Sequence, residues 1–210
     1  MNTAQESLFS EDIKLKKINF TEINTYLRCK LEYKYRYKPR NESYDPKGQD
    51  VYLGRFYHNI ILHYLSHKAN VRNKYLTKDV LYDKWKKLEK FYTDNFFEKT
   101  ILKNINLLKK SFLSTCDVLA CEYSLKKAYD NFLIKGRVDS IIQTDFGNII
   151  IDFKLNENEF NDFNSNLHRY LQLIIYYFGL KDSIEIKNAK LSHYFINTGK
   201  LEMIDQILYL

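Results

Sequence analysis

The 210-residue chain has few of the residues that interrupt or cross-link a fold: two prolines, six glycines and three cysteines. Cys29, Cys116 and Cys121 are odd in number and contain no CxxC pair, which argues against a disulfide framework and for a reducing, cytoplasmic compartment. No run of about 18 apolar residues occurs, and the N-terminus lacks the apolar stretch of a signal peptide. We therefore expect no membrane span and no membrane partner.

The composition that is present is typical of a globular protein. Hydrophobic residues make up 45% of the chain and charged residues 28%, and the length suits one domain with a sizeable core. The formal net charge is +7. A basic surplus favours polyanionic partners, because phosphates that bind Lys or Arg release condensed counterions. A solvated lysine-rich surface explains the charge equally well, so charge alone decides nothing.

The N-terminal half of the sequence has the apolar periodicity of helices. Tyrosines and apolar residues recur there at steps of three and four, and proline and glycine mark the interruption. The expected elements are a helix at about 22–38 with Thr21 as N-cap, a loop at 39–50, helices at about 51–67 and 79–97, and further helical or irregular chain to about 114.

The C-terminal half is rich in Val, Leu and Ile in short runs separated by turn residues, which indicates strands. The expected elements are strands at about 117–127, 131–143 and 148–155, a loop at 156–165, a helix at about 166–180, and strands at about 189–196 and 201–208. This order predicts an α/β fold: a mixed central sheet, built from a three-strand meander, a helix and further strands, with an N-terminal helical part. We expect residues 1–210 to form one domain, helical at about 20–114 and α/β at about 115–210.

Two aspartates and a lysine form the clearest candidate site. Asp152 and Lys154 alternate along one strand and so point to the same face, whereas Phe153 points to the core with its neighbours. If Thr144 to Gly147 close a four-residue hairpin loop, Asp139 faces Asp152 across the two strands, with Cβ atoms roughly 4.5–5.5 Å apart. Opposed carboxylates repel each other, and a divalent cation removes that repulsion.

A cation held by these aspartates would polarise a phosphodiester and activate water, with Lys154 stabilising charge on the phosphate. The alternative is an ion-pair cluster in which Lys154 or Arg137 neutralises the aspartates. A D-x-K sequence by itself favours the ion pair. The opposed register and the Gly-Arg-Val-Asp sequence that ends at Asp139 favour the metal site.

Further polar residues fall where they could join this site. Glu122, on the preceding strand, is a third carboxylate or an exposed strand charge. His58 follows Gly54 by four residues on one helix face, where Gly54 would permit close backbone approach, and it is a metal ligand or an ordinary helical histidine. One helix stripe either contacts DNA phosphates or faces solvent, and it comprises Arg169, Gln172 and Tyr176.

With these residues identified, the chain from about Phe20 onward resembles the RecB-like branch of the PD-(D/E)xK nuclease superfamily. Five motifs in order carry the resemblance: residues 25–35 resemble the tyrosine-and-cysteine first helix, Gly54 to His58 resemble G-x-x-x-H, and the others resemble GxxD (136–139), DxK (152–154) and QxxxY (172–176). The resemblance implies a restriction-endonuclease-like core and hydrolysis of DNA.

The resemblance also implies roles for single residues. It implies that Mg²⁺ or Mn²⁺ is bound by His58, Asp139, Asp152 and the carbonyl of Phe153. It implies a catalytic Lys154, DNA or active-site contacts by Gln172 and Tyr176 and, less securely, a role for Glu122. Partners implied are DNA and a helicase or CRISPR integrase, in DNA repair, recombination or CRISPR adaptation.

Two departures from the family concern the cysteines and their neighbours. Cys29 is followed by Lys30 instead of proline, and no cysteine follows Cys121. In cluster-bearing members, a cysteine like Cys29 joins three near the C-terminus to hold a [4Fe–4S] cluster. Such a cluster is expected here only if the chain is a fragment that lacks those cysteines.

Three functions remain open on the sequence. A metal-dependent DNA nuclease, such as an exonuclease acting on ends or single strands, accounts for all five motifs. A catalytically silent DNA-binding or assembly subunit with the same fold accounts for them if turnover has been lost. A structural α/β protein with a coincidental ion-pair cluster would require five ordered motifs to arise by chance.

Overall fold

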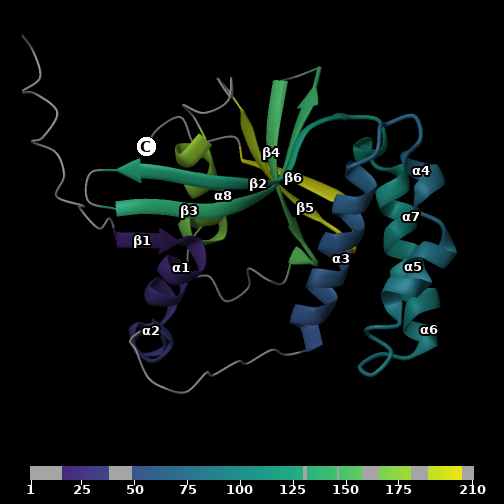
Figure 1. Cartoon of the computed structure of the whole chain (residues 1–210), viewed down its shortest axis with the longest axis horizontal. Coiled ribbons are helices and arrows are strands. Elements are labelled where there is room, and N and C mark those ends of the chain that lie inside the picture. Colours follow the sequence, from purple (N-terminus) through teal and green to yellow (C-terminus); the bar gives the residue numbers. More distant parts are fainter. Residues whose placement is uncertain are drawn as a thin grey trace, which may run out of the picture.

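In the described part of the chain, six strands form one mixed sheet with helices on both faces (Figure 1). The computed structural model describes residues 16–37, 49–129, 132–145, 147–157, 166–180 and 189–204. The strands are β1 (Lys16–Asn19), β2 (Asp117–Tyr129), β3 (Phe132–Thr144), β4 (Gly147–Lys154), β5 (Lys190–Phe195) and β6 (Lys200–Ile204). The expected α/β class with a mixed sheet and a helical N-terminal part is confirmed.

The helices lie mainly in the N-terminal part. They are α1 (Phe20–Arg28), α2 (Lys30–Tyr37), α3 (Gln49–Leu65), α4 (Arg72–Tyr75), α5 (Lys78–Trp85), α6 (Asp94–Phe96), α7 (Leu102–Lys110) and α8 (Asn166–Leu180), with a π-helical segment (Phe97–Ile101) and a 3₁₀ turn (Phe112–Ser114). Among the described helices, none combines the length and the apolar character that crossing a bilayer requires.

β3 is the strand that organises the sheet. β2 pairs antiparallel with it from one end to the other, so β1 and β4 share its opposite edge. β1 pairs in parallel as far as Lys135, and β4 pairs antiparallel from Ser140 onward. Residues 136–139 therefore lie between two partners, beside residues 152–154 of β4, which pair with β5 instead. We call these two stretches together the fork.

The β3–β4 hairpin has the register expected from the sequence. Thr144 pairs with Gly147, and the ladder continues without a shift to Ser140 and Ile151. Gly147 has a φ of 103°, which a residue with a side chain rarely adopts, so glycine permits this tight connection.

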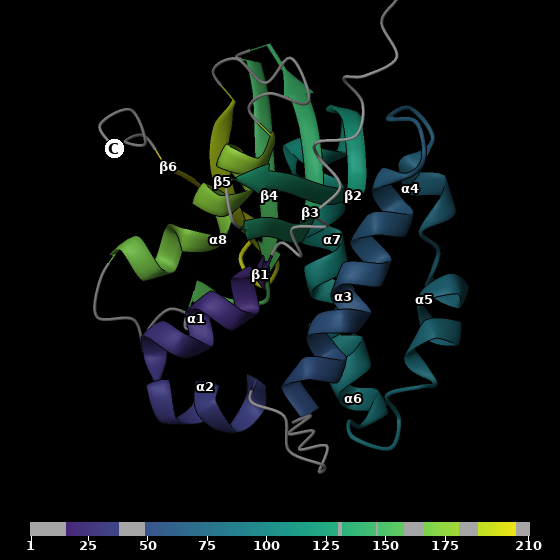
Figure 2. The same ribbon diagram turned by 60° about the vertical axis from the view of Figure 1, so that its left-hand side comes forward.

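The helices α3, α5 and α7 cover one face of the sheet, and Figures 1 and 2 agree on this placement. Ile149, Ile151 and Phe153 of β4 point into this layer and pack with Tyr57, Ile60, Ile61 and Trp85. Leu155 lies at its border. The expected alternation of β4, with these four residues on the core face, is confirmed.

The helix α8 covers the other face. Ile150 of β4 packs there with Leu173, Tyr176 and Leu180. Gly179 lies so close to β2 that an added Cβ would be 2.5 Å from both methyl carbons of Leu125. A glycine at this position therefore sets how near α8 approaches the sheet.

Two expected helices are interrupted in the structure. The helix expected at 22–38 divides at Cys29, whose φ of −154° and ψ of 104° are extended, and Asn19 instead of Thr21 caps its start by accepting the N–H of Glu22. The helix expected at 79–97 divides into α5 and α6, capped by Thr77 and Thr93. In each case a local cap or break outweighs a continuous apolar stripe.

Some expectations concern chain that is not described. The loops expected at 39–50 and 156–165 fall largely on residues outside the described ranges, as do the end of the strand expected at 201–208 and Phe146 in the hairpin loop. β1 was not expected from the sequence, because its pairing with β3 joins segments far apart in the chain.

Candidate active site

Asp139 lies in the fork as a buried carboxylate. The residue is 7% exposed, and its Oδ2 accepts the backbone N–H of Phe153 at 2.9 Å. The β3–β4 ladder ends at Ser140 and Ile151, one step before the expected pair of Asp139 with Asp152. The side chain of Asp139 thus takes the backbone hydrogen bond at the point where the strands part.

Burial is the main electrostatic influence on Asp139. Burial and, after it, the negative charge of Asp152 raise the pKa of this carboxyl, and His58, the N–H of Phe153 and Lys154 lower it, so that the pKa is about 7. The two carboxylates therefore repel each other, and the facing pair expected from the sequence stays a prediction because the described ladder ends at Ser140 and Ile151. A cation at this place would relieve both the burial cost and the repulsion.

His58 reaches the fork from α3. Its Nε2 lies 3.0 Å from the carbonyl oxygen of Phe153 and 3.7 Å from Oδ2 of Asp139. Gly54, one turn earlier, does not serve close backbone approach as expected, since an added Cβ would meet no described atom within 4 Å. Gly54 instead leaves open the wall of the cavity in front of His58.

Asp152 and Lys154 form a buried ion pair beside Asp139. Lys154 Nζ is 2.8 Å from Oδ2 of Asp152 and donates to Oε1 of Gln172 at 3.0 Å. Asp152 is 1% exposed. His193, which pairs with Asp152 in the β4–β5 register, is fully buried and has its Nε2 3.6 Å from the same Oδ2.

Gln172 and Tyr176 extend this network along α8. Gln172 donates from Nε2 to the hydroxyl of Tyr176 at 2.6 Å, and burial, followed by the charges of Asp152 and Asp139, raises the pKa of that hydroxyl. Tyr176 also covers Gly136, where an added Cβ would lie 3.4 Å from the tyrosine ring. The glycine that begins Gly-Arg-Val-Asp therefore makes room for the tyrosine of the α8 motif.

Glu122 contributes a third carboxylate from β2. Its φ of 52° places it in the left-handed region, which costs a non-glycine residue of the order of 1 kcal/mol. Its Oε2 is 2.6 Å from Nε of Arg137. Such backbone strain persists only where the surrounding structure imposes it, and here it directs a carboxylate toward the fork.

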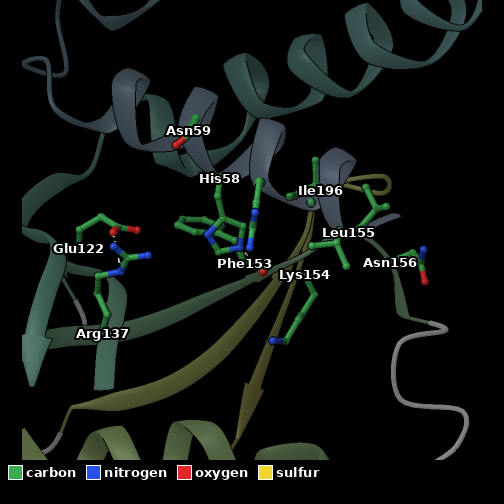
Figure 3. A pocket seen from close by; sticks show the side chains of 12 residues that line it. His58, Asn59, Glu122, Arg137, Phe153, Lys154, Leu155, Asn156 and Ile196 are labelled. Carbon is green, nitrogen blue, oxygen red and sulfur yellow. Dashed lines mark hydrogen bonds and ion pairs between the residues drawn. The ribbon is translucent and has the colours of Figure 1, made fainter. Parts of the chain in front are cut away.

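Of these residues, His58, Glu122, Arg137, Phe153 and Lys154 border a cavity of about 840 Å³ between α3 and the sheet (Figure 3). Figure 3 shows His58 pointing from α3 toward the sheet and Arg137 reaching Glu122. The cavity is lined by Val51, Gly54, Arg55, His58, Asn59, Glu122, Arg137, Phe153, Lys154, Leu155, Asn156 and Ile196. Its size is within the range of roughly 300–1,000 Å³ typical of ligand sites.

The donor atoms fit a divalent cation. His58, Glu122 and Asp139 each offer one ligand atom, and these atoms lie within 4.8 Å of one another. The carbonyl oxygen of Phe153 is adjacent to His58. Carboxylate and carbonyl oxygens suit Mg²⁺ and Mn²⁺, and the imidazole nitrogen of His58 adds one donor to them. Asp152 lies outside this group of three and is paired with Lys154.

The structure brings together most of the residues singled out in the sequence. His58, Glu122, Asp139, Asp152, Phe153, Lys154, Gln172 and Tyr176 all lie at the fork or on the network that leads from it. Arg169 belongs to α8, but its side chain is outside the described part of the chain.

Two further residues at the fork were missed as site candidates in the sequence. Arg137 had been considered only as a neutralising cation, and it pairs with Glu122. His193 had no role, although a single histidine in an apolar strand is an unusual signal that could have been followed. Its contact with Asp152 depends on the parallel β4–β5 register, which local sequence does not reveal.

Comparison with known proteins agrees with this geometry. A family model described as the PD-(D/E)XK nuclease superfamily matches residues 17–206. None of the curated proteins matches the chain. The matched span includes the fork and the residues that reach it, from His58 on α3 to His193 on β5.

Proposed function

Since the chain belongs to the PD-(D/E)XK nuclease superfamily, whose members are metal-dependent phosphodiesterases, we propose that it is a Mg²⁺- or Mn²⁺-dependent deoxyribonuclease. The observation that supports this most directly is the approach of His58, Glu122 and Asp139 to within 4.8 Å of one another. The buried pair of Asp152 and Lys154 lies directly beside them. Nitrogen and oxygen donors next to a fixed ammonium are the groups that phosphodiester hydrolysis needs.

Each residue has a distinct role in this proposal. His58, Glu122 and Asp139, whose donor atoms lie closest together, would hold the metal, and Asp152 and the carbonyl of Phe153 would complete its ligands. A bound divalent cation activates water and withdraws charge from the phosphate. Lys154 faces the developing negative charge, and its ammonium is kept in place by Gln172.

Gln172 and Tyr176 act on the substrate side of the network. The hydroxyl of Tyr176 accepts from Gln172, which in turn accepts from Lys154, so the three side chains are oriented as a unit. In this orientation they can contact the DNA phosphates that flank the one being cut, together with Arg169.

The test is cleavage of end-labelled single- and double-stranded DNA with Mn²⁺. We expect Asp152→Asn to lower the cleavage rate by about 100-fold or more while the fold is kept, since the carboxylate next to Lys154 is removed. Asp145→Asn is the matched control, because Asp145 is exposed in the β3–β4 turn. EDTA should stop the reaction. Unchanged cleavage by Asp152→Asn would refute the assignment of the site.

The order of motifs supports a finer placement in the RecB-like branch, as a cytoplasmic exonuclease of DNA repair, recombination or CRISPR adaptation. A helicase or CRISPR integrase is the partner that this placement proposes. The product ladder of the same assay tests it, since an exonuclease releases products progressively from one end of the labelled strand.

One observation favours a second function, a catalytically silent DNA-binding or assembly subunit. Glu122 is paired with Arg137, which removes a carboxylate from the group available to a metal. Calorimetric titration with Mn²⁺ separates the two functions. A nuclease binds Mn²⁺ and loses this binding in Asp139→Asn, whereas a binding-only subunit shows no Mn²⁺ binding that depends on Asp139.

A further inference from the structure

A second cavity adjoins the active-site cavity on the neighbouring face of α3, between that helix and α5 with the turn that follows it. Its volume is about 510 Å³. It is lined by Tyr52, Arg55, Phe56, Asn59, Asp83, Lys84, Lys87, Leu88 and Lys90. We call it the α3–α5 groove. The proposed hydrolysis gives no role to any residue of this groove. Arg55 and Asn59 nevertheless also line the active-site cavity.

The charged residues of the α3–α5 groove are mostly cations. Arg55, Lys84, Lys87 and Lys90 contribute positive charge, and Asp83 is the acid among the lining residues. The carboxylate of Asp83 lies 3.4 Å from Nζ of Lys86, which is outside the groove, so its charge is partly neutralised from there. The groove is therefore suited to an anionic occupant.

The groove is continuous with the active-site cavity over one turn of α3. Arg55 and Asn59 are four residues apart, and each lines both cavities. Figures 1 and 2 show α3 between the sheet on one side and α5 on the other. An extended anionic polymer that leaves the active-site cavity across Arg55 would enter the groove directly.

Aromatic rings hold one of the lysines at the groove. Tyr52 and Phe91 stack with ring centroids 4.9 Å apart, and Nζ of Lys90 lies 5.8 Å from the first ring and 4.8 Å from the second. Cation–π contacts of this kind restrict the lysine, so less conformational entropy is lost when its ammonium binds a phosphate.

We propose that the α3–α5 groove binds the phosphate backbone of a single nucleic-acid strand that extends from the active site over Arg55. This inference rests on the proposed function. A single strand fits because it can bend over α3 from one cavity to the other. A duplex is stiff over about 150 base pairs and does not bend sharply from one hollow into the other across a single turn of helix.

The experiment compares two lysine triples for binding to single-stranded DNA. The groove variant is Lys84→Ala, Lys87→Ala and Lys90→Ala, and the control variant is Lys99→Ala, Lys103→Ala and Lys110→Ala. The control removes the same charge from exposed lysines that line neither cavity. Fluorescence anisotropy is measured in EDTA, where cleavage does not occur, with oligonucleotides of about 4 and about 16 nucleotides.

We expect the groove variant to bind the longer oligonucleotide on the order of 10- to 100-fold more weakly. Its plot of log affinity against log salt should be less steep by about 2, because each lost phosphate contact on a single strand removes about 0.7. The control variant should bind like the unchanged protein. The shorter oligonucleotide should bind all three alike, since it occupies only the active-site cavity.

Other outcomes would overturn the inference. Equal weakening by both triples would assign the effect to net charge. A groove variant that binds like the unchanged protein would refute a strand in the groove, even if cleavage is normal. If a polyglutamate of matched length also binds the groove variant more weakly than the unchanged protein, by the same factor, the occupant of the groove would be an acidic protein segment. If the unchanged protein never cleaves DNA but the groove variant still binds the longer oligonucleotide more weakly, the proposed strand in the groove would stand and the proposed nuclease function would be refuted.

Discussion

At the scale of the residue, Asp139 combines a structural and a chemical task. Its carboxylate accepts the N–H of Phe153 where the β3–β4 ladder ends, and burial raises its pKa to about 7. The folded protein without metal therefore favours the protonated carboxyl. In the proposed metal site Asp139 would have to be ionised to bind the cation, so metal binding and proton release would be linked at this residue.

This linkage predicts how the stability of the metal-free protein depends on pH. The pKa of Asp139 rises from 3.8 in the unfolded chain to about 7 in the fold. Asp139 binds its proton more tightly in the folded protein than in the unfolded chain. Its contribution to the free energy of unfolding is therefore most favourable below pH 3.8 and is lost as the pH rises toward 7, and above pH 7 the free energy no longer changes through this group. The loss should be on the order of a few kcal/mol.

Urea unfolding in EDTA across this range measures the effect. Asp139→Asn cannot ionise, so the unfolding free energy of the unchanged protein should fall relative to this variant between pH 4 and 7. Added Mn²⁺ should reduce the difference at high pH. Parallel pH profiles for the two proteins would contradict the raised pKa.

Local sequence sufficed for part of the site. Asp139, Asp152 and Lys154 were predicted to be neighbours because a strand alternates its side chains and a short hairpin sets its own register. His193 was not predicted, because its contact with Asp152 depends on the parallel pairing of β4 with β5, and α8 separates these two strands in the chain. The strained backbone of Glu122 has no signal in the sequence either.

At the scale of the element, α8 is placed by the contact between Gly179 and Leu125. A Cβ at residue 179 would be 2.5 Å from the leucine methyl carbons, so the helix cannot remain where it is in a larger variant. α8 also contributes Gln172 and Tyr176 to the fork. Its distance from the sheet therefore determines whether Lys154 keeps its partner.

Gly179→Ala should destabilise the protein by about 1–3 kcal/mol and lower the cleavage rate, because overpacking displaces α8. Leu125→Ala alone leaves a cavity and should cost about 2–5 kcal/mol. The double variant should cost less than the sum of the two, because the shortened leucine makes room for the new methyl group. Chemical unfolding of the three variants gives the comparison, and additive costs would show that the two residues do not meet.

The order and type of most elements were predicted from hydrophobic periodicity. The three strands of the meander and α8 begin and end close to their expected positions. The breaks at Cys29 and after Trp85 were not predicted, since neither has a proline or glycine beside it. β1 was missed because a four-residue strand is stabilised by its partner rather than by its own sequence.

At the scale of the whole molecule, successive residues of β4 belong to opposite cores. Ile149 and Ile151 pack against the α3 layer, whereas Ile150 packs against α8. Neither layer can separate from the sheet without exposing a face of the same strand. We therefore propose that the chain unfolds as one domain, as the sequence suggested.

Two probes of unfolding test this proposal. Trp85 is the single tryptophan and is buried in the α3 layer, so its fluorescence reports that side. Far-ultraviolet circular dichroism reports all the helices and strands. Both signals should change at the same urea concentration with the same slope. A fluorescence transition at lower urea would show that the helical part unfolds separately.

The fork joins residues that are widely dispersed along the chain: His58 from α3, Glu122 from β2, Asp139 from β3, Asp152 from β4 and His193 from β5. β1 must also find β3, with Lys16 opposite Phe132. Contacts of such high contact order form slowly, because long loops must close first. A chain emerging from the ribosome therefore contains its acidic residues long before it contains a site. In the proposed nuclease, cleavage of a phosphodiester would therefore start only after the last strands have joined the sheet.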